Sequence, residues 1–486
     1  MITKVRAKYI IAHENDTNVI YEDCEMIYED NTIIEIGHNT KGKYDEFVDY
    51  GKSIISPGFI DLDALGDIDH ALFYMEQEDN KKLYWCKEYF ENGPKECMTQ
   101  KEEAFKSLYA YIQLISHGIT TAMPITCVYY KKAGETYEEI EEAVKNAAKL
   151  GLRVYLGPSY ISAMHIYNEE TGKQEIRYMY DEGKEGLERA KRFVKEYNGA
   201  YDGLINAAMV PERIELQTEE ILKETKAYAK KENILMRLHG AQGEFEYNII
   251  QNKYNMSPIK YMDKIGLLDK NTLIPHAIYA SGYSKIDDKS DEDLKILVDR
   301  EVSVIHCPLV YSRSGQALES FGRYKRFGVK MCMGTDTFPP NIFENIRVAS
   351  AMSMHIDGNR KESYYKEFFE AATLGGAKAL GRDDLGKLCK GAKADFIVID
   401  LDDIGIGTID DPLRTICMCA NGNNIKYSII NGKVVLENGI ISGIDYENIK
   451  KEAQKYYDKF KASFIERSAF KEKEEFFQNS YKIIKN

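Results

Sequence analysis

Three apolar runs of this chain each end in a polar side chain that could do chemistry. One run ends at His239 and is followed by Gln242, a second ends at His276, and a third leads from Met331 to Asp336. An apolar run that stops at Gly, Pro or Asn turn residues is typical of a buried strand with its last side chain at the carboxyl end. In a parallel α/β barrel this is where the chemistry lies, because the loops from strand to helix open there. For Asp336 alone, capping of the next helix is the alternative interpretation.

The composition excludes several classes of protein. The 486 residues are 44% hydrophobic and 29% charged, as in a globular protein with a large core and an accessory domain. The net charge of -13 argues against a nucleic-acid surface. No apolar run approaches the roughly 18 residues of a membrane span, and the N-terminus has no apolar signal region. The nine Cys form no CxxC pair, which indicates a reducing cytoplasm and no disulfide framework.

The order of expected elements predicts the architecture. Residues 1–56 and 387–445 alternate short β-branched segments with turns, so we expect these two ends to form one composite β-sandwich domain. Residues 57–386 alternate helices and strands, with eight strands near Phe59, Ile119, Val154, Leu204, Leu235, Leu273, Val304 and Met331. This pattern predicts a (β/α)₈ TIM-like barrel. Residues 446–486 are charged and are expected to be helical.

Several motifs occur in one order along about 390 residues. They are Pro57-Gly58-Phe59-Ile60-Asp61, Gly151-Leu152-Arg153-Val154-Tyr155-Leu156-Gly157, His306-Cys307-Pro308, Gly334-Thr335-Asp336 with Asn341 and Arg347, the Ala372–Gly381 segment and the Gly386–Asp400 segment. In this order they resemble the amidohydrolase superfamily, in particular its chlorohydrolase and cytosine-deaminase-like branch.

The resemblance implies a hydrolase that uses one divalent metal ion to activate water against a C–N or C–Cl bond of a small nitrogen heterocycle or cyclic amide. By position, His239 and Asp336 would be metal ligands, and His276 would carry protons together with Asp336. Gln242 and His306 would contact the substrate. For His276, a hydrogen-bonded core histidine is the alternative.

The chain departs from the family pattern at two places. Where the family has His-x-His on strand one, this chain has Asp63-Ala64-Leu65, and where it has a proton-carrying Glu, this chain has Gln242. Asp63 is therefore the candidate third ligand, and Asp67, Asp69 and His70 on the same loop are further candidates. The alternative for that loop is capping and solvation. Carboxylate-rich ligation would favour Mn²⁺ or Fe²⁺ over Zn²⁺.

Glu244 and Glu246 follow Gln242 and could reach into the site in its place. Solvated loop acids are the expected interpretation of both.

Three functions stay open on the sequence. The first is the metal-dependent hydrolase, with a small-molecule substrate and no nucleic-acid or membrane partner. The second is a barrel that has lost catalysis and serves as a binding or regulatory protein. The third is a metal-free enzyme in which His276 and Asp336 act as an acid–base pair. In each case a cytoplasmic homo-oligomer, a dimer or higher, is expected.

Overall fold

The computed structural model describes residues 1–68, 84–93, 96–126, 131–313, 315–359, 361–470 and 481–484. Its centre is an eight-stranded parallel sheet curled into a barrel, in the strand order β16-β15-β14-β13-β12-β9-β8-β6. The strands are β6 (Phe59–Leu65), β8 (Ile119–Ile125), β9 (Arg153–Leu156), β12 (Ile205–Met209), β13 (Leu235–Arg237), β14 (Thr272–Pro275), β15 (Ser303–His306) and β16 (Lys330–Met333). All eight predicted strands are present, and the predicted fold class is confirmed.

Side-chain alternation along the strands fills the barrel interior. One cluster of buried residues takes at least one member from every barrel strand, and includes Ile60, Met123, Tyr155, Ala208, Leu235, Leu273, Ile305 and Cys332. The neighbouring strand residues, such as Val154, Met236 and Val304, belong to a second cluster that packs against the outer helices. This is the two-sided burial that a parallel sheet covered by helices requires.

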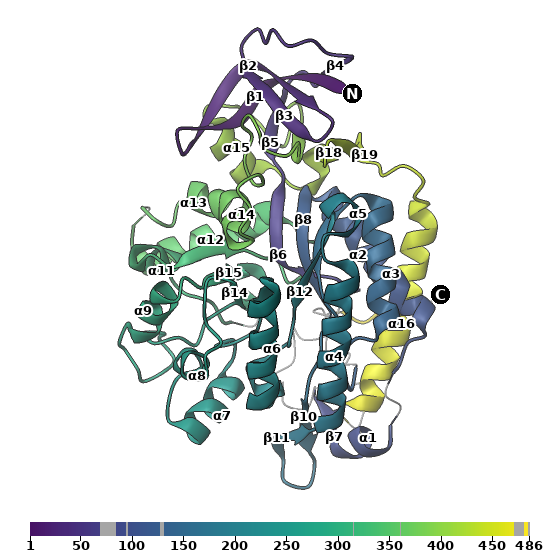
Figure 1. Ribbon diagram of the computed structural model, residues 1–486, viewed down its shortest axis with the longest axis vertical. Helices are drawn as coiled ribbons and strands as arrows, with labels where there is room; N and C mark the ends of the chain where they lie inside the picture. The colour runs from purple at the N-terminus through teal and green to yellow at the C-terminus, as the bar shows by residue number, and fades with distance from the viewer. Residues whose placement is uncertain are drawn as a thin grey trace.

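Helices follow the barrel strands and cover the outside (Figure 1). They are α2 (Gln100–Ser116), α3 (Tyr137–Leu150), α4 (Tyr180–Tyr197), α5 (Ala200–Gly203), α6 (Glu219–Glu232), α7 (Glu244–Tyr254), α8 (Pro258–Lys264), α9 (Glu292–Asp299), α10 (Pro308–Ser312), α11 (Phe321–Phe327), α12 (Ile342–Asp357), α13 (Tyr365–Glu370) and α14 (Gly376–Ala379). Thr218 caps α6, since its side chain accepts a hydrogen bond from the Ile221 N–H.

A second sheet joins the two ends of the chain above the barrel (Figure 1). Its strands are β1 (Ile2–Glu14), β2 (Thr17–Glu29), β3 (Thr32–Gly37), β4 (Glu46–Asp49), β5 (Ser53–Pro57), β17 (Phe396–Asp400), β18 (Ile425–Ile430) and β19 (Lys433–Glu437). The connection is the antiparallel pairing of β5 with β17, in which Ile55 lies opposite Val398. Strand β5 leads directly into β6, so the sheet is continuous in sequence with the barrel.

Some elements extend beyond the barrel and this sheet. Strands β7 (Trp85–Cys86), β10 (Ala163–Asn168) and β11 (Lys173–Tyr178) form a small sheet that the sequence did not predict. The remaining helices are α1 (Lys87–Asn92), α15 (Pro412–Cys419) and α16 (Tyr446–Arg467), with short 3-10 turns at η4 (Ile214–Leu216) and η6 (Gly422–Asn424) and a π-turn at η5 (Ala371–Gly375). Helix α16 packs against α1 and α2.

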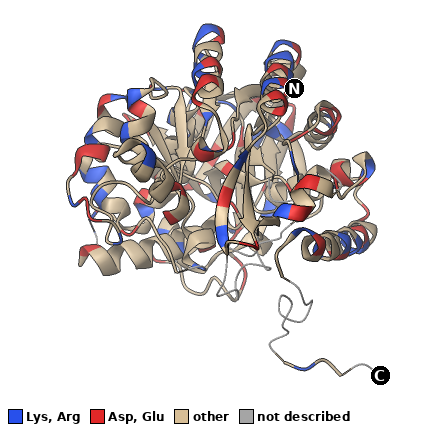
Figure 2. Ribbon diagram, turned by 90° about the horizontal axis from the view of Figure 1, so that it is seen from below, with Lys and Arg blue, Asp and Glu red and all other residues tan. Residues whose placement is uncertain are grey.

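Figure 2 shows acidic and basic residues interspersed on the helices around the barrel. Within the part of the chain that the structure describes, no helix is long and apolar enough to cross a bilayer.

Polar contacts join the first and last strands of the barrel. The Asp61 carboxylate accepts hydrogen bonds from the Thr335 N–H at 3.0 Å and the Thr335 hydroxyl at 2.6 Å. The Asp336 N–H donates to the Asp63 carbonyl at 2.8 Å. These bonds hold the carboxyl ends of β6 and β16 together and so bring Asp63 beside Asp336.

Candidate active site

Four polar side chains meet where the barrel strands end. Asp63 comes from β6, His239 and His276 follow β13 and β14, and Asp336 follows β16. Asp63 Oδ2 lies 3.7 Å from His239 Nε2 and 3.6 Å from His276 Nε2. His276 Nε2 is also 3.6 Å from Asp336 Oδ2. The structure therefore brings together the predicted ligands and the predicted proton carriers.

A backbone carbonyl orients His239. Its Nδ1 lies 2.9 Å from the Glu212 carbonyl oxygen, which also accepts the His239 N–H. A carbonyl partner of this kind requires a proton on Nδ1, so Nε2 is the nitrogen that faces Asp63. Metal-binding histidines are commonly fixed in this way through their outer nitrogen.

Asp63 is completely buried, and its two oxygens face different neighbours. Oδ2 faces the two imidazoles and accepts the Cys307 thiol at 3.6 Å, whereas Oδ1 lies 3.7 Å from Arg237 Nη1. Burial alone would raise the pKa of Asp63, but the charge and hydrogen bond of His239, with Arg237 and His276, hold it below its usual range. The residue is therefore a carboxylate and not a carboxylic acid.

The sequence analysis did not single out Arg237. Leu235 belongs to the interior cluster, and Met236 and Leu238 belong to the outer one. The alternation along the strand thus directs both Arg237 and His239 into the barrel. The sequence did contain a signal for Arg237: it is a charged residue within an apolar run, two positions before the candidate ligand His239.

The backbone around the site adopts a rare conformation. Five non-glycine residues there have positive φ, namely Glu212 at 43°, Ala241 at 55°, His276 at 67°, Ala277 at 46° and Asp336 at 47°. Such conformations cost of order 1–3 kcal/mol each and concentrate at functional sites. Here they turn the chain sharply at the strand ends, which directs His276 and Asp336 toward Asp63.

Asp63, His239 and His276 fit a divalent cation. One ligand atom from each lies within 4.8 Å of the others. In a tetrahedral site with bonds of about 2.0–2.1 Å, the ligand atoms stand about 3.3–3.4 Å apart, close to the 3.6 and 3.7 Å observed for Asp63. Among the described residues, Asp63 Oδ1 and both ring nitrogens of His276 are buried without a hydrogen-bond partner. Two imidazoles and a carboxylate with an open position form a catalytic ligand set.

Burial shifts the two remaining groups toward their neutral forms. Burial lowers the pKa of His276 well below its usual value, although the charge of Asp63 opposes the shift. Burial and the charge of Asp63 raise the pKa of Asp336 well above its usual value. The neutral imidazole of His276 can thus act as a ligand, and Asp336 can exchange a proton.

Gln242 lies at the edge of the site in a dense polar cluster. Its side-chain oxygen accepts a hydrogen bond from Arg213, and the Gln242 side chain also forms a hydrogen bond with Tyr311. The Gln242 and Ala241 N–H groups donate to the two carboxylate oxygens of Glu246, at 2.9 and 2.6 Å. The expectation that Glu246 is a solvated loop acid is therefore wrong, because it is buried and holds the loop that carries Gln242. Glu244 is exposed, as expected.

His306 points away from the four central residues. Ile305 and Cys307 belong to the interior cluster, so the residue between them faces outward. The His306 ring packs against Phe321 and Phe368, with centroids 5.7 and 6.2 Å apart, and burial lowers its pKa to about 3. A substrate-binding role for His306 stays a prediction.

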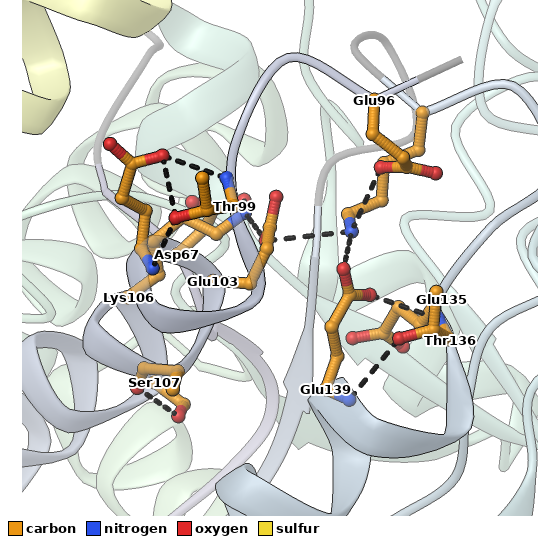
Figure 3. Close-up of polar contacts among 12 residues, drawn as sticks. Asp67, Glu96, Thr99, Glu103, Lys106, Ser107, Glu135, Thr136 and Glu139 are labelled. Carbon is orange, nitrogen blue, oxygen red and sulfur yellow. Dashed lines mark hydrogen bonds and ion pairs between the residues drawn. The ribbon is translucent and has the colours of Figure 1, made fainter.

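Of the other acids on the loop after β6, the structure describes Asp67. Asp67 is buried and pairs with Lys106 at 3.2 Å, on the α2 side of the strand (Figure 3). Asp69 and His70, the further candidates for the missing ligands, lie outside the described residues. Asp63 thus remains the strand-one ligand that the described geometry supports.

A second group of acids, Glu96, Glu103 and Glu139, has the spacing of a cation site. The three acids are labelled in Figure 3, and the ammonium group of Lys131 pairs with all of them. Its Nζ is 3.7, 3.4 and 2.6 Å from the three carboxylates. The position that a cation would take among these acids is therefore occupied by a lysine of the chain itself.

The architecture and the site define a class of protein. Eight parallel strands present imidazoles and carboxylates at their carboxyl ends, which is where barrel enzymes carry their active sites. A family model described as the amidohydrolase family matches residues 54–435. The chain belongs to the amidohydrolase family, as its motifs predicted.

Curated relatives extend over nearly the whole chain. A 5'-deoxyadenosine deaminase of Methanosarcina acetivorans is 27% identical over 455 residues, 93% of this chain and 96% of its own length. A 5-methylthioadenosine/S-adenosylhomocysteine deaminase of Pyrococcus abyssi is 25% identical over 442 residues, with 90% and 93% covered. The predicted enzyme class, a hydrolase of C–N bonds other than peptide bonds or of C–Cl bonds in a small nitrogen heterocycle, is confirmed.

Solved structures share the fold. An adenosine deaminase from Xanthomonas campestris with bound zinc has a TM-score of 0.75 at 16% identity, covering 95% of this chain and 98% of its own. Atrazine chlorohydrolase from Arthrobacter aurescens, complexed with zinc, has a TM-score of 0.75 at 17% identity, with 93% and 99% covered. Both of these structures contain bound zinc.

Proposed function

We propose that this protein is a metal-dependent deaminase of an amino-substituted purine nucleoside. The two deaminases named above support this substrate class, since the chain matches nearly their full length. In such a reaction water adds to the ring carbon that carries the amino group. The C–N bond then breaks, and the nitrogen leaves as ammonia after it gains a proton.

The observation that carries the proposal is the compact arrangement of Asp63, His239 and His276. These three residues would hold the cation, which we take to be zinc, iron or manganese. A divalent cation in such a site activates water as a nucleophile at neutral pH. Asp336 is the nearest further carboxylate, 3.6 Å from His276. With the cation bound beside it, Asp336 would be a carboxylate, so it would accept the proton of the attacking water and pass it to the leaving nitrogen.

This assignment alters two roles inferred from the sequence. His276 becomes a ligand, since its ring nitrogens lack hydrogen-bond partners among the described residues and Nε2 faces two carboxylates. Asp336 becomes the proton carrier. Gln242 cannot carry a proton, but its amide, fixed by Arg213 and Tyr311, can donate to or accept from a ring nitrogen of the substrate.

The test is turnover by protein purified without chelator and analysed for metal. We expect ammonia release from 5'-deoxyadenosine or 5-methylthioadenosine with about one divalent ion per chain, and little release by Asp336→Asn. Chloride release from a chlorotriazine, without ammonia release from nucleosides, would move the proposal to the C–Cl branch. Metal-loaded protein that turns over neither substrate would contradict it.

A barrel that binds without turnover is the second candidate function. It is favoured by one observation: Gln242, a residue that cannot transfer a proton, stands where the family carries a Glu. Co-purification of a ligand that the metal-loaded protein leaves unchanged would support it. A cytoplasmic homo-oligomer remains our expectation for either function, to be measured by light scattering.

A further inference from the structure

Arg237 is a cation enclosed within the barrel. Its side chain is 2% exposed and lies on the interior face of β13, next to His239. Nη1 donates to the Met123 carbonyl at 2.7 Å, and Nη2 donates to the Pro124 carbonyl at 3.2 Å. These bonds satisfy donors of the guanidinium but do not neutralise its charge, and an uncompensated buried charge is strongly destabilising.

Asp63 supplies the charge of opposite sign. Arg237 Nη1 is 3.7 Å from Asp63 Oδ1, the oxygen that has no hydrogen-bond partner among the described residues. The other oxygen, Oδ2, faces His239 and His276. The guanidinium is fixed by the carbonyl groups at the end of β8, so it attracts Oδ1 to one side and leaves Oδ2 directed at the imidazoles.

We propose that Arg237 is the internal counter-ion of Asp63, which holds this carboxylate in place before the metal arrives and competes with the metal for its charge. The proposal deepens the proposed function and rests on its ligand set. Arg237 is thus a positioning residue, and it acts on the cation through Asp63. Together the two residues are electrically neutral, so the pair presents a ligand oxygen without adding net negative charge to the site.

Two consequences follow from simple electrostatics. Without a cation, loss of Arg237 removes the guanidinium that faces the buried Asp63 Oδ1, so the metal-free protein should become less stable. With a cation, loss of Arg237 removes a fixed positive charge close to the divalent ion, so the ion should bind more tightly. A residue that only filled space in the barrel would produce the first effect without the second.

The first measurement is a double-mutant cycle in metal-free protein. Asp63→Asn, Arg237→Met and the double variant are compared with the parent by denaturant unfolding. We expect the double variant to lose clearly less stability than the sum of the single losses, because each single change leaves one unpaired charge. Additive losses would overturn the counter-ion assignment. If Arg237→Met does not fold, Arg237→Gln replaces it, since Gln removes the charge and keeps a donor for the β8 carbonyls.

The second measurement is a calorimetric titration of metal-free protein with Zn²⁺ and with Mn²⁺, which gives the affinity for each ion. We expect Arg237→Met to bind at least about tenfold more tightly than the parent. Arg153→Met is the matched control, because Arg153 is equally buried and pairs with Asp395 at 3.0 Å, at the start of β9 and away from the site. The control should lose stability and keep the parent's affinity. Equal or weaker binding by Arg237→Met would overturn the competition.

The two measurements separate this inference from the proposed function. Coupling in the cycle without metal binding by any variant would remove the metal-dependent mechanism and the competition, and keep the counter-ion. Metal binding by the parent, with additive losses in the cycle, would keep the metal-dependent mechanism and remove the counter-ion assignment. Binding only by Arg237→Met would support the competition directly.

Discussion

Asp63 is the side chain on which the candidate site depends, because two imidazoles and a guanidinium all face its carboxylate. His276 and His239 approach one oxygen, and Arg237 approaches the other. Since the residue is fully buried, its charge must be balanced inside the protein. Asp63 replaces a histidine of the family pattern on β6, and the guanidinium of Arg237 on β13 supplies a positive charge beside it.

Removal of either imidazole should abolish the metal site. We expect His239→Ala and His276→Ala to reduce metal affinity by more than about 100-fold, beyond the 10–100-fold typical of groups that only support a ligand. His306→Ala is the control, since its ring packs against Phe321 and Phe368. Elemental analysis after dialysis checks this result. Equal metal content in all three variants would place the ion elsewhere.

Glu215 should make stability depend on pH. Burial, with the charge of Glu246, raises its pKa to about 8, from an ordinary value of 4.5. Between these values the folded protein keeps a proton that the unfolded chain has lost, so stability falls as pH rises through this window. Glu215→Gln removes the effect, and its melting temperature should rise relative to the parent between pH 5 and pH 8.

Thermal unfolding at several pH values measures this difference. The exposed Glu220→Gln, on the neighbouring helix α6, serves as the control and should follow the parent throughout. A constant difference between Glu215→Gln and the parent would mean that Glu215 is ionised in the folded state.

At the scale of the elements, the barrel must close between β6 and β16. These are the two ends of the strand order, and the described ladder pairs do not include one between them. Hydrogen bonds to a side chain join these two strands instead, because the Asp61 carboxylate accepts one from the Thr335 N–H and one from the Thr335 hydroxyl. The same contacts set the separation of Asp63 and Asp336, so closure and site geometry depend on one another.

Thr335→Val tests this closure. Valine has a similar shape but cannot donate, so the buried Asp61 Oδ2 loses its hydroxyl partner, at a cost of about 1–3 kcal/mol. Thr335→Ser keeps the hydroxyl and should cost less. Denaturant unfolding of the two variants gives the comparison. A loss of stability in Thr335→Ser but not in Thr335→Val would indicate that the methyl group, and not the hydrogen bond, matters at this position.

At the scale of the whole molecule, the two chain ends complete each other. Residues from both, including Val5, Met26, Phe396 and Ile429, pack in one buried cluster. Arg153 on β9 bonds to Asp395, just before β17, and so joins the barrel to this sheet. The barrel is thus held at its amino-terminal side by a sheet that neither end could form alone.

Deletion of residues 1–50 should therefore unfold or aggregate the protein. The truncation removes β1 to β4 and leaves the edge of β5 and the apolar face of β17 uncovered. Size-exclusion chromatography and thermal unfolding check this outcome. A soluble truncated protein with an unchanged melting midpoint would show that the sheet is not needed.

The sequence by itself determined the fold, because hydrophobic periodicity and turn residues are local signals. The eight barrel strands and the β-rich ends all follow from runs of a few residues. The sheet of β7, β10 and β11 was missed, although β10 and β11 form a local hairpin. The pairing of β7 with β10 joins segments about 80 residues apart and has no local mark. The identity of the candidate residues Asp63, His239, His276 and Asp336 was also readable, since each ends a strand.

Only the tertiary structure decided which of those residues lie together and which neighbours each one contacts. The sequence could not place Asp67 against Lys106 or turn His306 away, because both depend on which helix packs over which strand. Nor could it join Arg237 to Asp63, which stand 174 positions apart, since 237 − 63 = 174. Buried charges are balanced through space, and the partner of a buried charge is therefore known only once the chain has folded.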